Sequence, residues 1–294
     1  MFIAKTVEAL RTFRKRLDGS TALVPTMGAL HAGHLALVQQ AHEVADHVIV
    51  SLFVNPTQFA PSEDLAQYPR PIADDLALCR EAQVACVFAP EVSEMYPPDE
   101  VACVVDVPEI TGPLEGDVRP GHFAGVGRVC LKLFHMAQPD VAVFGQKDYQ
   151  QLMLIRALAA DLALPMRIVA CPTVREADGL ALSSRNRYLD AAQRRHALGL
   201  FKALRQAQAM IEQGECDPQI VEETMRTTMA SHQIEVDYAA VRHPLTLSEL
   251  DNLDPATCGG VVALVAGRLT GATTVRLIDN FLIGGEPERS VLPR

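Results

Sequence analysis

Residues 1–175 alternate two kinds of segment, and this alternation constrains the fold more than any other feature of the sequence. Short apolar runs rich in β-branched residues are separated by segments in which apolar residues recur with a helical period. That order is typical of an α/β fold, in which a parallel sheet carries helices on both faces. We predict strands at residues 21–24, 48–54, 84–88, 141–144 and 167–170.

The sequence after Arg187 has a different order. Two Ala- and Gln-rich helical stretches come first, and three apolar runs at 234–241, 261–265 and 274–278 follow. Helices followed by strands favour a smaller α+β domain. Because Asp178 and Gly179 supply a turn near this change, we predict one domain at 1–178 and a second at 179–294.

Composition argues against several classes of protein. The chain has 294 residues, 49% of them hydrophobic, which is enough for two cores, and it contains no apolar run long enough for a membrane span. Its formal net charge of −10 argues against a nucleic-acid partner, because phosphate backbones require clustered Lys and Arg. Seven cysteines without a CxxC pair indicate reduced thiols. We therefore expect a soluble, cytoplasmic protein with no membrane partner and no structural metal.

The sharpest motif covers residues 25–34 and reads PTMGALHAGH, between a predicted strand and an amphipathic helix. In open parallel sheets, ligands bind beyond the carboxyl ends of strands, and a helix N-terminus offers backbone amides and partial positive charge to phosphate. Gly28 and Gly33 allow a phosphate to approach the backbone closely. His31 and His34, three residues apart, can point the same way and donate hydrogen bonds to phosphates.

The spacing HxxH alone fits two surface histidines beside a turn, but the strand before it and the helix after it favour a nucleotide site. The HxGH arrangement resembles the signature of the nucleotidylyl-transferase superfamily, in which the α-phosphorus of a nucleoside triphosphate is attacked. Asn55 and Gln58, in the segment VNPTQF, follow the next strand. Their neutral amides can bind the hydroxyls and carboxylate of a small polar acid, although a simple turn also explains them.

Two later segments carry candidate phosphate ligands. In FGQKDYQQL, Lys147 is suited to neutralise phosphate charge and Asp148 to bind ribose hydroxyls. In LSSRN, Ser183, Ser184 and Arg185 combine hydroxyl donors with a guanidinium that can close on the β and γ phosphates. A solvated helix start and an exposed hinge are the alternative explanations.

Together these segments resemble the pantothenate synthetase family. The sequence contains PTMGALHAGH, SLFVNPTQF, YPR, LEG, RPGHF, FGQKDYQQL and DGLALSSRNRYL in the family's order and spacing, and the similarity extends to RLIDN at 276–280. The resemblance implies a Rossmann-like ATP- and pantoate-binding domain at 1–178 with a smaller α+β lid domain at 179–294, paired as a homodimer.

The resemblance also implies the site residues. Asp74, and with it Asp75, aligns with an acidic segment linked to magnesium, although a charge at a helix N-terminus explains both equally well. The catalytic set would be His34, His31, Lys147 and Arg185, and Gln58 and Gln151 would bind pantoate, with Gln58 also near β-alanine. Asn55 is a further candidate ligand of pantoate or β-alanine because of its neutral amide. ATP would be bound by Met27, Gly28, Ala29, Leu30, His31, Ala32, Gly33, His34, Gly145, Gln146, Lys147, Asp148, Val174, Leu182, Ser183, Ser184 and Arg185.

The implied activity is a two-step ligation that forms a C–N bond in pantothenate biosynthesis, on the way to coenzyme A. The carboxylate of pantoate attacks the α-phosphorus of ATP and gives pantoyl adenylate and pyrophosphate, and the β-alanine amine then displaces AMP. Magnesium would accompany ATP as co-substrate, without a tightly bound organic cofactor. His34 would donate either a proton or a hydrogen bond to the phosphates.

Two other functions stay open at this point. Another adenylyl- or cytidylyl-transferase would share the HxGH chemistry, and the VNPTQF and SSRN segments argue against it. A non-catalytic nucleotide-sensing module would keep the fold without the reaction, and the joint presence of His31, His34, Lys147 and Arg185 argues against that.

Overall fold

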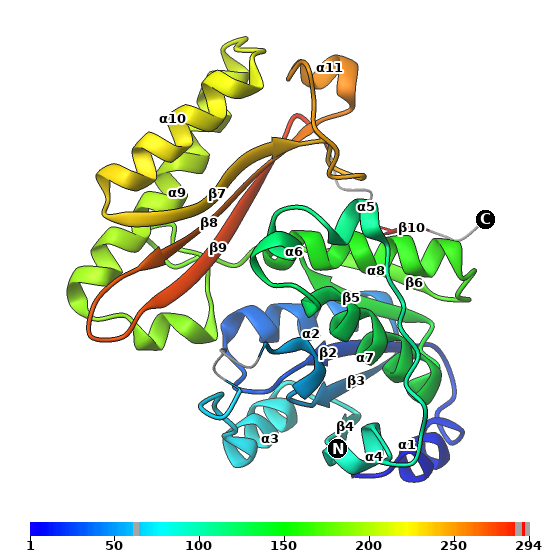
Figure 1. Ribbon diagram of the computed structural model, residues 1–294. Helices are drawn as coiled ribbons and strands as arrows, with labels where there is room; N and C mark the ends of the chain where they lie inside the picture. The colour runs from blue at the N-terminus through cyan, green and yellow to red at the C-terminus, as the bar shows by residue number, and fades with distance from the viewer. Residues whose placement is uncertain (61–64, 286–289, 292–294) are drawn as a thin grey trace. The chain divides into compact units, whose positions relative to one another are not determined.

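The structure is a computed structural model that describes residues 1–60, 65–285 and 290–291 (Figure 1). The chain forms two compact units. The first unit comprises Met1–Gly145, Leu154–Cys171 and the described part of Arg289–Arg294. The second unit comprises Gln146–Met153 and the described part of Pro172–Glu288. The assignment of an ATP- and pantoate-binding domain to 1–178 and a lid to 179–294 stays a prediction.

A seven-stranded sheet forms the centre of the first unit, in the order β1-β4-β3-β2-β5-β6-β10. Strands β1 to β6 run parallel, whereas β10 pairs antiparallel with β6. The strands are β1 (Phe2–Ala4), β2 (Thr21–Thr26), β3 (His47–Leu52), β4 (Cys86–Phe88), β5 (Val141–Gly145), β6 (Arg167–Cys171) and β10 (Ser290–Val291).

Helices connect these parallel strands, as the alternating sequence predicts. The long ones are α1 (Val7–Arg14), α2 (Ala32–Val44), α3 (Ile72–Glu81), α7 (His122–Ala137) and α8 (Tyr149–Asp161). Short turns of helix lie at η1 (Pro56–Gln58), α4 (Val92–Met95), α5 (Pro108–Thr111) and α6 (Glu115–Val118). The residues of α8 up to Met153 belong to the second unit and those from Leu154 to the first.

Side chains from both faces of the sheet are buried, which explains why its strands are apolar throughout. Val143 of β5 packs in one cluster with Val38 and Ala41 of α2 and Cys79 of α3. The next residue, Phe144, points to the opposite face because side chains alternate along a strand. There it makes an edge contact with Phe134 of α7, at 6.3 Å between ring centroids. Helices therefore cover both faces of the sheet.

The second unit packs two long helices against a three-stranded antiparallel sheet with the order β7-β8-β9. Gln193, buried near the start of α9, donates from its amide to the carbonyls of Leu269 and Thr273 at 3.0 and 2.7 Å, which ties the helix to the β8–β9 turn. The elements are η2 (Gln146–Asp148), η3 (Ser184–Tyr188), α9 (Ala191–Glu212), α10 (Pro218–Ser231), β7 (Ile234–Arg242), α11 (Pro255–Cys258), β8 (Val261–Leu269) and β9 (Val275–Ile283).

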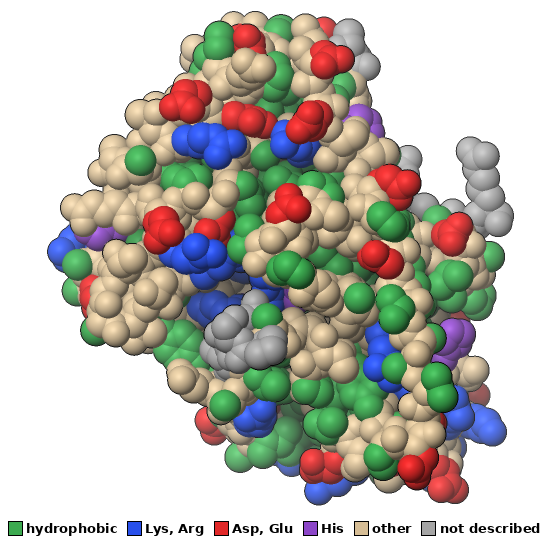
Figure 2. Space-filling view, in the orientation of Figure 1, with side chains coloured by type: hydrophobic (Ala, Val, Ile, Leu, Met, Phe, Trp, Pro, Cys, Tyr) green, Lys and Arg blue, Asp and Glu red, His purple; other side chains and the backbone are tan. Residues whose placement is uncertain are grey.

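The fold class predicted from the sequence is confirmed, and each predicted strand is present among β2 to β9. The sequence did not indicate β1 or β10, because three and two residues are too few to show an alternating pattern. On the face shown in Figure 2, Lys and Arg side chains lie among those of Asp and Glu. Among the described residues, no helix combines the length and the apolarity needed to cross a membrane.

Candidate active site

The motif segments of the first unit meet at the carboxyl edge of the parallel sheet. β2 ends at Thr26 and lies between β3, which ends at Leu52, and β5, which ends at Gly145. The chain passes from β2 to β3 on one side and later returns to β5 on the other, so the strand order reverses at β2. In open α/β sheets, ligands bind outside the carboxyl ends of the strands at such a reversal.

The turn after β2 is fixed by its own hydroxyl and by left-handed backbone. Thr26 donates its hydroxyl hydrogen to the carbonyl of Ser51 at 2.7 Å and accepts a hydrogen bond from the Gly28 amide at 3.1 Å. Gly28 and Ala29 have φ angles of 82° and 52°. This conformation turns the chain from the strand into α2, and glycine adopts it without strain.

Asp75, at the start of α3, also fixes the chain after β2. Its carboxylate is 2% exposed and accepts hydrogen bonds from the amides of Ala29 at 2.9 Å and Leu30 at 2.7 Å. A Cβ at Gly28 would lie 2.9 Å from this carboxylate, so a side chain there would displace it. From the sequence, Asp75 was predicted to belong with Asp74 to an acidic segment linked to magnesium, or to be a charge at a helix N-terminus. Its contact with the HxGH turn was not predicted.

His31 and His34 cap the N-terminus of α2 through their Nδ1 atoms. The Gly33 amide donates to Nδ1 of His31 at 3.1 Å, and the His31 amide donates to Nδ1 of His34 at 3.3 Å. The two rings lie 4.1 Å apart between centroids. Because a neutral imidazole whose Nδ1 accepts carries its hydrogen on Nε2, both histidines are held in the tautomer that donates from Nε2.

This capping changes the expected source of phosphate donors. We expected free backbone amides at the start of α2, but the amides of Gly28, Ala29, Leu30, His31, Gly33 and His34 all donate within the protein. The donors that this turn can present to a phosphate are therefore the imidazole Nε2–H groups rather than these amides.

Asn55 after β3 is buried, and its contacts are with the protein itself. Its amide nitrogen donates to Gln58 Oε1 at 3.0 Å and to the Gly125 carbonyl at 3.1 Å. Its oxygen accepts hydrogen bonds from Thr57 and from the Tyr96 hydroxyl, the latter at 2.8 Å. Burial raises the pKa of Tyr96, so the hydroxyl stays a donor at neutral pH. These contacts suit Asn55 to orienting its neighbour.

Gln58 is the neighbour that Asn55 orients. With its Oε1 bound to Asn55, its amide nitrogen faces Met27 of the HxGH turn, 3.1 Å from the sulfur. His122, in the RPGHF segment, donates from Nδ1 to the Gln58 carbonyl at 2.9 Å while its Nε2 lies 3.1 Å from Arg119. The RPGHF segment, for which the sequence predicted no role, thus fixes the backbone of Gln58.

Asp74, the candidate magnesium ligand, is exposed in the first turn of α3, next to the buried Asp75. The described residues contain no group of three or more His, Cys, Asp or Glu side chains suited to a metal ion. Mg²⁺ in nucleotide enzymes is commonly bound by one or two carboxylates with phosphates and water. An exposed Asp74 fits that mode, whereas Asp75 is already engaged with backbone amides.

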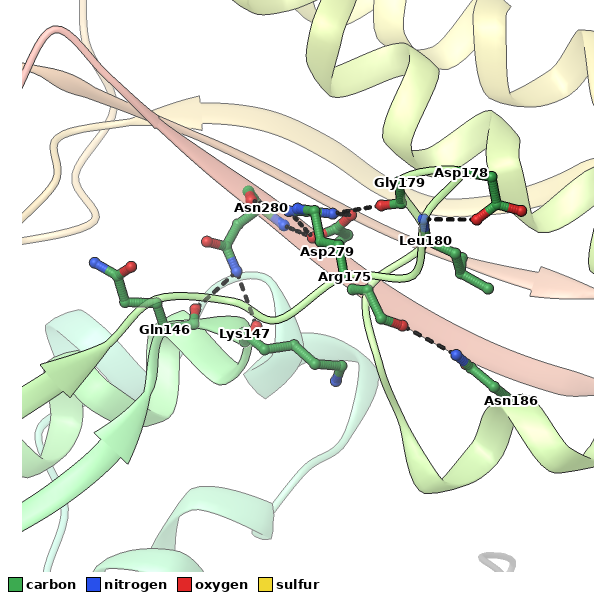
Figure 3. Close-up of polar contacts among 10 residues, drawn as sticks. Gln146, Lys147, Arg175, Asp178, Gly179, Leu180, Asn186, Asp279 and Asn280 are labelled. Carbon is green, nitrogen blue, oxygen red and sulfur yellow. Dashed lines mark hydrogen bonds and ion pairs between the residues drawn. The ribbon is translucent and has the colours of Figure 1, made fainter. Parts of the chain in front are cut away.

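The second unit contains the remaining motif residues. Lys147 lies in η2, with its ammonium 3.7 Å from the Asp148 carboxylate, and Gln151 lies in the first turn of α8. Asn280 of β9 donates to the carbonyls of Gln146 and Lys147 at 2.9 and 2.8 Å (Figure 3). The backbone that carries Lys147 is therefore fixed to β9.

Arg175 and Asp279 form a second polar contact of β9. The guanidinium makes two hydrogen bonds to the carboxylate, of 2.6 and 2.8 Å (Figure 3). It also lies over the rings of Phe201 and Phe281. Burial raises the pKa of Asp279 while the Arg175 hydrogen bonds act in the opposite direction. The RLIDN segment at 276–280 is part of the family resemblance, which implies no role for Asp279.

The segment with the predicted β- and γ-phosphate ligands follows Arg175. Arg175 forms an isolated β-bridge with Ala181, and the Leu182 amide donates to the Val174 carbonyl at 3.0 Å. Ser183 then caps η3 by accepting a hydrogen bond from the Arg185 amide at 3.2 Å. Ser183, Ser184 and Arg185 are all partly exposed. The segment is therefore neither buried nor fully exposed.

Comparison with known proteins connects this geometry to a family. A sequence model of the family described as pantoate-β-alanine ligase matches residues 2–282. The chain belongs to the pantoate-β-alanine ligase family. A curated pantothenate synthetase of Roseiflexus sp. (strain RS-1) is 48% identical over 96% of this chain and 99% of its own length. One from Rhizobium rhizogenes (strain K84) is 49% identical over 96% of this chain and 94% of its own length.

Solved structures agree with this assignment. The crystal structure of pantothenate synthetase from Thermus thermophilus is 42% identical, covers 96% of this chain and 99% of its own, and superposes with a TM-score of 0.87. A pantoate-β-alanine ligase from Francisella tularensis, complexed with β-γ ATP and β-alanine, is 34% identical, covers 96% of this chain and 97% of its own, and has a TM-score of 0.77. The family inferred from the sequence is confirmed.

Proposed function

We propose that this protein condenses pantoate with β-alanine at the expense of ATP, through an enzyme-bound pantoyl adenylate, and releases pyrophosphate and AMP. The observation that carries the proposal is the HxGH turn, where two imidazoles accept backbone amides at Nδ1 and so carry their hydrogens on Nε2, at the strand end where the strand order reverses. Such a site suits attack on a nucleotide phosphate. Family membership supports the identity of the acid and the amine.

In the first step, the pantoate carboxylate attacks the α-phosphorus and pyrophosphate leaves. His31 and His34 stabilise the growing phosphate charge by donating hydrogen bonds, and Lys147 and Arg185 supply positive charge. The predicted ATP-binding segments at 27–34, 145–148 and 182–185, together with Val174, complete this set. In the second step, the amine of β-alanine attacks the activated carbonyl, and AMP leaves with the electron pair of the acyl–oxygen bond.

His34 acts in this proposal as a hydrogen-bond donor rather than a proton donor. A protonated imidazole would carry a hydrogen on Nδ1 as well, where His34 accepts from the His31 amide. The neutral tautomer avoids that conflict and still donates from Nε2. We therefore expect His34→Gln, whose amide can also donate, to retain more adenylation activity than His34→Ala. Equal losses in the two variants would favour proton transfer.

Gln58 and Gln151 are the proposed amide ligands of pantoate, with Gln58 also near β-alanine. Asn55, which we predicted as a substrate ligand, acts through Gln58, because both hydrogens of its amide are donated to protein acceptors. That arrangement directs the Gln58 amide nitrogen away from Asn55, where it can donate to a carboxylate or hydroxyl of the substrate. Neutral amides bind an acid without competing with its attack on phosphorus.

Asp74 is the proposed protein ligand of a magnesium ion that enters with ATP. The ion would neutralise phosphate charge and strengthen pyrophosphate as a leaving group. Phosphate oxygens and water would complete its coordination, since Mg²⁺ keeps several waters in such sites. Asp74→Asn should therefore raise the magnesium concentration needed for half-maximal rate, and an unchanged magnesium dependence would exclude Asp74 as a ligand.

We further propose a homodimer in the cytoplasm. Residues 101–105 read VACVV, and the side chains of Val101 and Val104 are 99% and 79% exposed. Exposed apolar residues in a row commonly mark a protein interface. The seven cysteines are free thiols, which suits a reducing compartment. Light scattering should give a molar mass of twice the 31.9 kDa of one chain, and Val104→Asp should lower this mass toward that of a monomer.

The proposed reaction is tested with purified protein and isotope-labelled substrates. With ATP and pantoate alone, we expect pyrophosphate in an amount limited to the enzyme present, with the adenylate retained. Addition of β-alanine should start turnover and give equal amounts of AMP and pantothenate. Turnover of ATP without pantoate, or equal use of another acceptor acid, would contradict the proposal.

A further inference from the structure

β9 of the second unit contains an asparagine whose side chain is committed to one short segment. Asn280 is 6% exposed, and its amide nitrogen donates to two consecutive carbonyls, at 2.9 Å to Gln146 and 2.8 Å to Lys147 (Figure 3). Both hydrogens of the amide are used in this way. A single side chain therefore determines the orientation of two successive peptide groups in η2.

The backbone of Asn280 is fixed on both sides by the Arg175–Asp279 pair. The backbone amide of Asn280 donates to Asp279 Oδ1 at 2.8 Å, and its backbone carbonyl accepts a hydrogen bond from Arg175 at 3.2 Å. Arg175 also donates to the Gly179 carbonyl at 3.0 Å. Since the Asp279 carboxylate is buried and doubly bound to the guanidinium, the pair is a rigid support for Asn280.

We propose that Asn280 is a positioning residue for the phosphate ligand Lys147, and that the Arg175–Asp279 ion pair holds Asn280 in the orientation this requires. The inference rests on the proposed function, in which Lys147 contacts the phosphates. Asn280 touches neither substrate nor phosphate in this role and acts through the backbone of η2. Loss of its two hydrogen bonds lets the Lys147 peptide group rotate, so the ammonium no longer meets the developing charge.

A double-mutant cycle separates this role from general stability. Because small displacements of catalytic groups cost up to about a hundredfold in rate, we expect Asn280→Ala to reduce adenylation about ten- to hundredfold. In a Lys147→Ala background, the same substitution should cause little further loss, because the group that it positions is already absent. Full additivity of the two losses would overturn the proposal.

Gln193 provides a matched control within the same unit. It too is a buried amide that donates to two carbonyls, those of Leu269 and Thr273. Gln193→Ala should therefore lower the thermal midpoint about as much as Asn280→Ala while leaving the adenylation rate unchanged. A rate loss in Gln193→Ala equal to that in Asn280→Ala would show a purely structural effect and would also overturn the proposal.

A smaller substitution covers the case in which Asn280→Ala fails to fold. Asn280→Ser keeps one hydroxyl donor, and circular dichroism with thermal unfolding establishes whether its fold is intact. A folded Asn280→Ser enzyme with wild-type rate and wild-type KM for ATP would reject the inference. Absence of pyrophosphate release by the wild-type protein with ATP and pantoate would instead reject the proposed function, so the two failures are distinguishable.

Discussion

Two segments of this protein contain the groups predicted to meet phosphate, and they are held in opposite ways. In the HxGH turn of the first unit, backbone amides donate to a buried carboxylate, Asp75. In η2 of the second unit, backbone carbonyls accept from a buried amide, Asn280. Asp75 is a charged side chain that accepts hydrogen bonds, whereas Asn280 is a neutral side chain that donates them.

The difference follows from what each segment presents. The HxGH turn presents imidazole Nε2–H groups, and Asp75 takes up two amides that would otherwise stay unpaired in a buried turn. Lys147 in η2 presents a full positive charge, so a neutral amide can hold its backbone without adding another carboxylate beside the ammonium. Charged supports form stronger hydrogen bonds, whereas neutral ones leave the local charge unchanged.

The largest expected effect is that of Asp75→Ala. This change leaves the amides of Ala29 and Leu30 without their acceptor and frees the turn that positions both histidines, so adenylation should fall about a hundredfold or more. Pyrophosphate release measures it. Asp46→Ala is the control, because Asp46 also binds a turn, through Ser20, but at the amino end of β2 and β3. A similar loss of adenylation in Asp46→Ala would mean that the effect of Asp75→Ala does not come from the histidine turn.

Changing the acceptor Asp75 to an amide and the donor Asn280 to a carboxylate tests whether each support needs its own chemistry. Asp75→Asn keeps one acceptor oxygen, so it should lose less activity than Asp75→Ala. Asn280→Asp places a carboxylate against two carbonyls, so it should lose more activity than Asn280→Ala. Steady-state kinetics of the four variants, with folding checked by circular dichroism, shows which of the two variants at each position is more active. If Asn280→Asp were the more active variant at that position, the donor role of Asn280 would be wrong.

The two units should also differ in alkaline solution. Burial raises the pKa of the thiols of Cys79 to about 11 and of Cys86 and Cys130 to about 12, and all three lie in the first unit. In the unfolded chain these thiols lose their protons near pH 9, at lower pH than in the folded protein. Their contribution to the free energy of unfolding is therefore complete below pH 9 and declines from there toward about pH 12. A fully buried thiol contributes about 1.4 kcal/mol per pH unit to that slope.

Urea unfolding at pH 8 and pH 10.5 measures the alkaline effect. Cys130→Ala should flatten the pH dependence, even though the cavity lowers stability at both values. The matched variant Cys216→Ala, in the second unit, should leave the dependence as in the wild type. Equal slopes for all three proteins would mean that other groups cause the loss.

The smallest expected effect concerns an exposed ion pair of the second unit. The Arg194 guanidinium lowers the pKa of Asp178, so the stabilisation is present at neutral pH and is lost as the pH falls through the lowered value, below 3.8. Since the Asp178 side chain is 44% exposed and solvent screens the pair, Asp178→Asn should cost only about 0.5 kcal/mol at pH 7. The difference from wild type should vanish near pH 2. A constant difference down to that pH would assign the loss to another cause.

The sequence predicted the elements better than the contacts between them. Strands β2 to β9 follow from apolar runs, and the HxGH turn follows from its glycines and its position after β2. The support by Asp75 could not be derived, because the acidic pair at the start of α3 looks like ordinary helix capping. Asn280 lies 133 residues from Lys147 in the chain, and no local pattern connects them.

The use of the α2 amides was predicted incorrectly for a physical reason. A helix N-terminus leaves amides to be satisfied, and whether side chains or a ligand satisfy them depends on rotamers that a sequence does not specify. Here the histidines turn their Nδ1 atoms inward and form the cap themselves. The same residues that suggested a phosphate site thus occupy the amides that we expected to bind it.

The long separation between Asn280 and its acceptors has a consequence for synthesis of the chain. Gln146 and Lys147 leave the ribosome 134 and 133 residues before the side chain that fixes them. Contacts this distant in sequence close large loops and form late in folding. A nascent or truncated chain that ends before β9 would have a complete HxGH turn and an unsupported η2. If Lys147 meets phosphate as proposed, the segment that carries it would be ordered only after β9 has been made.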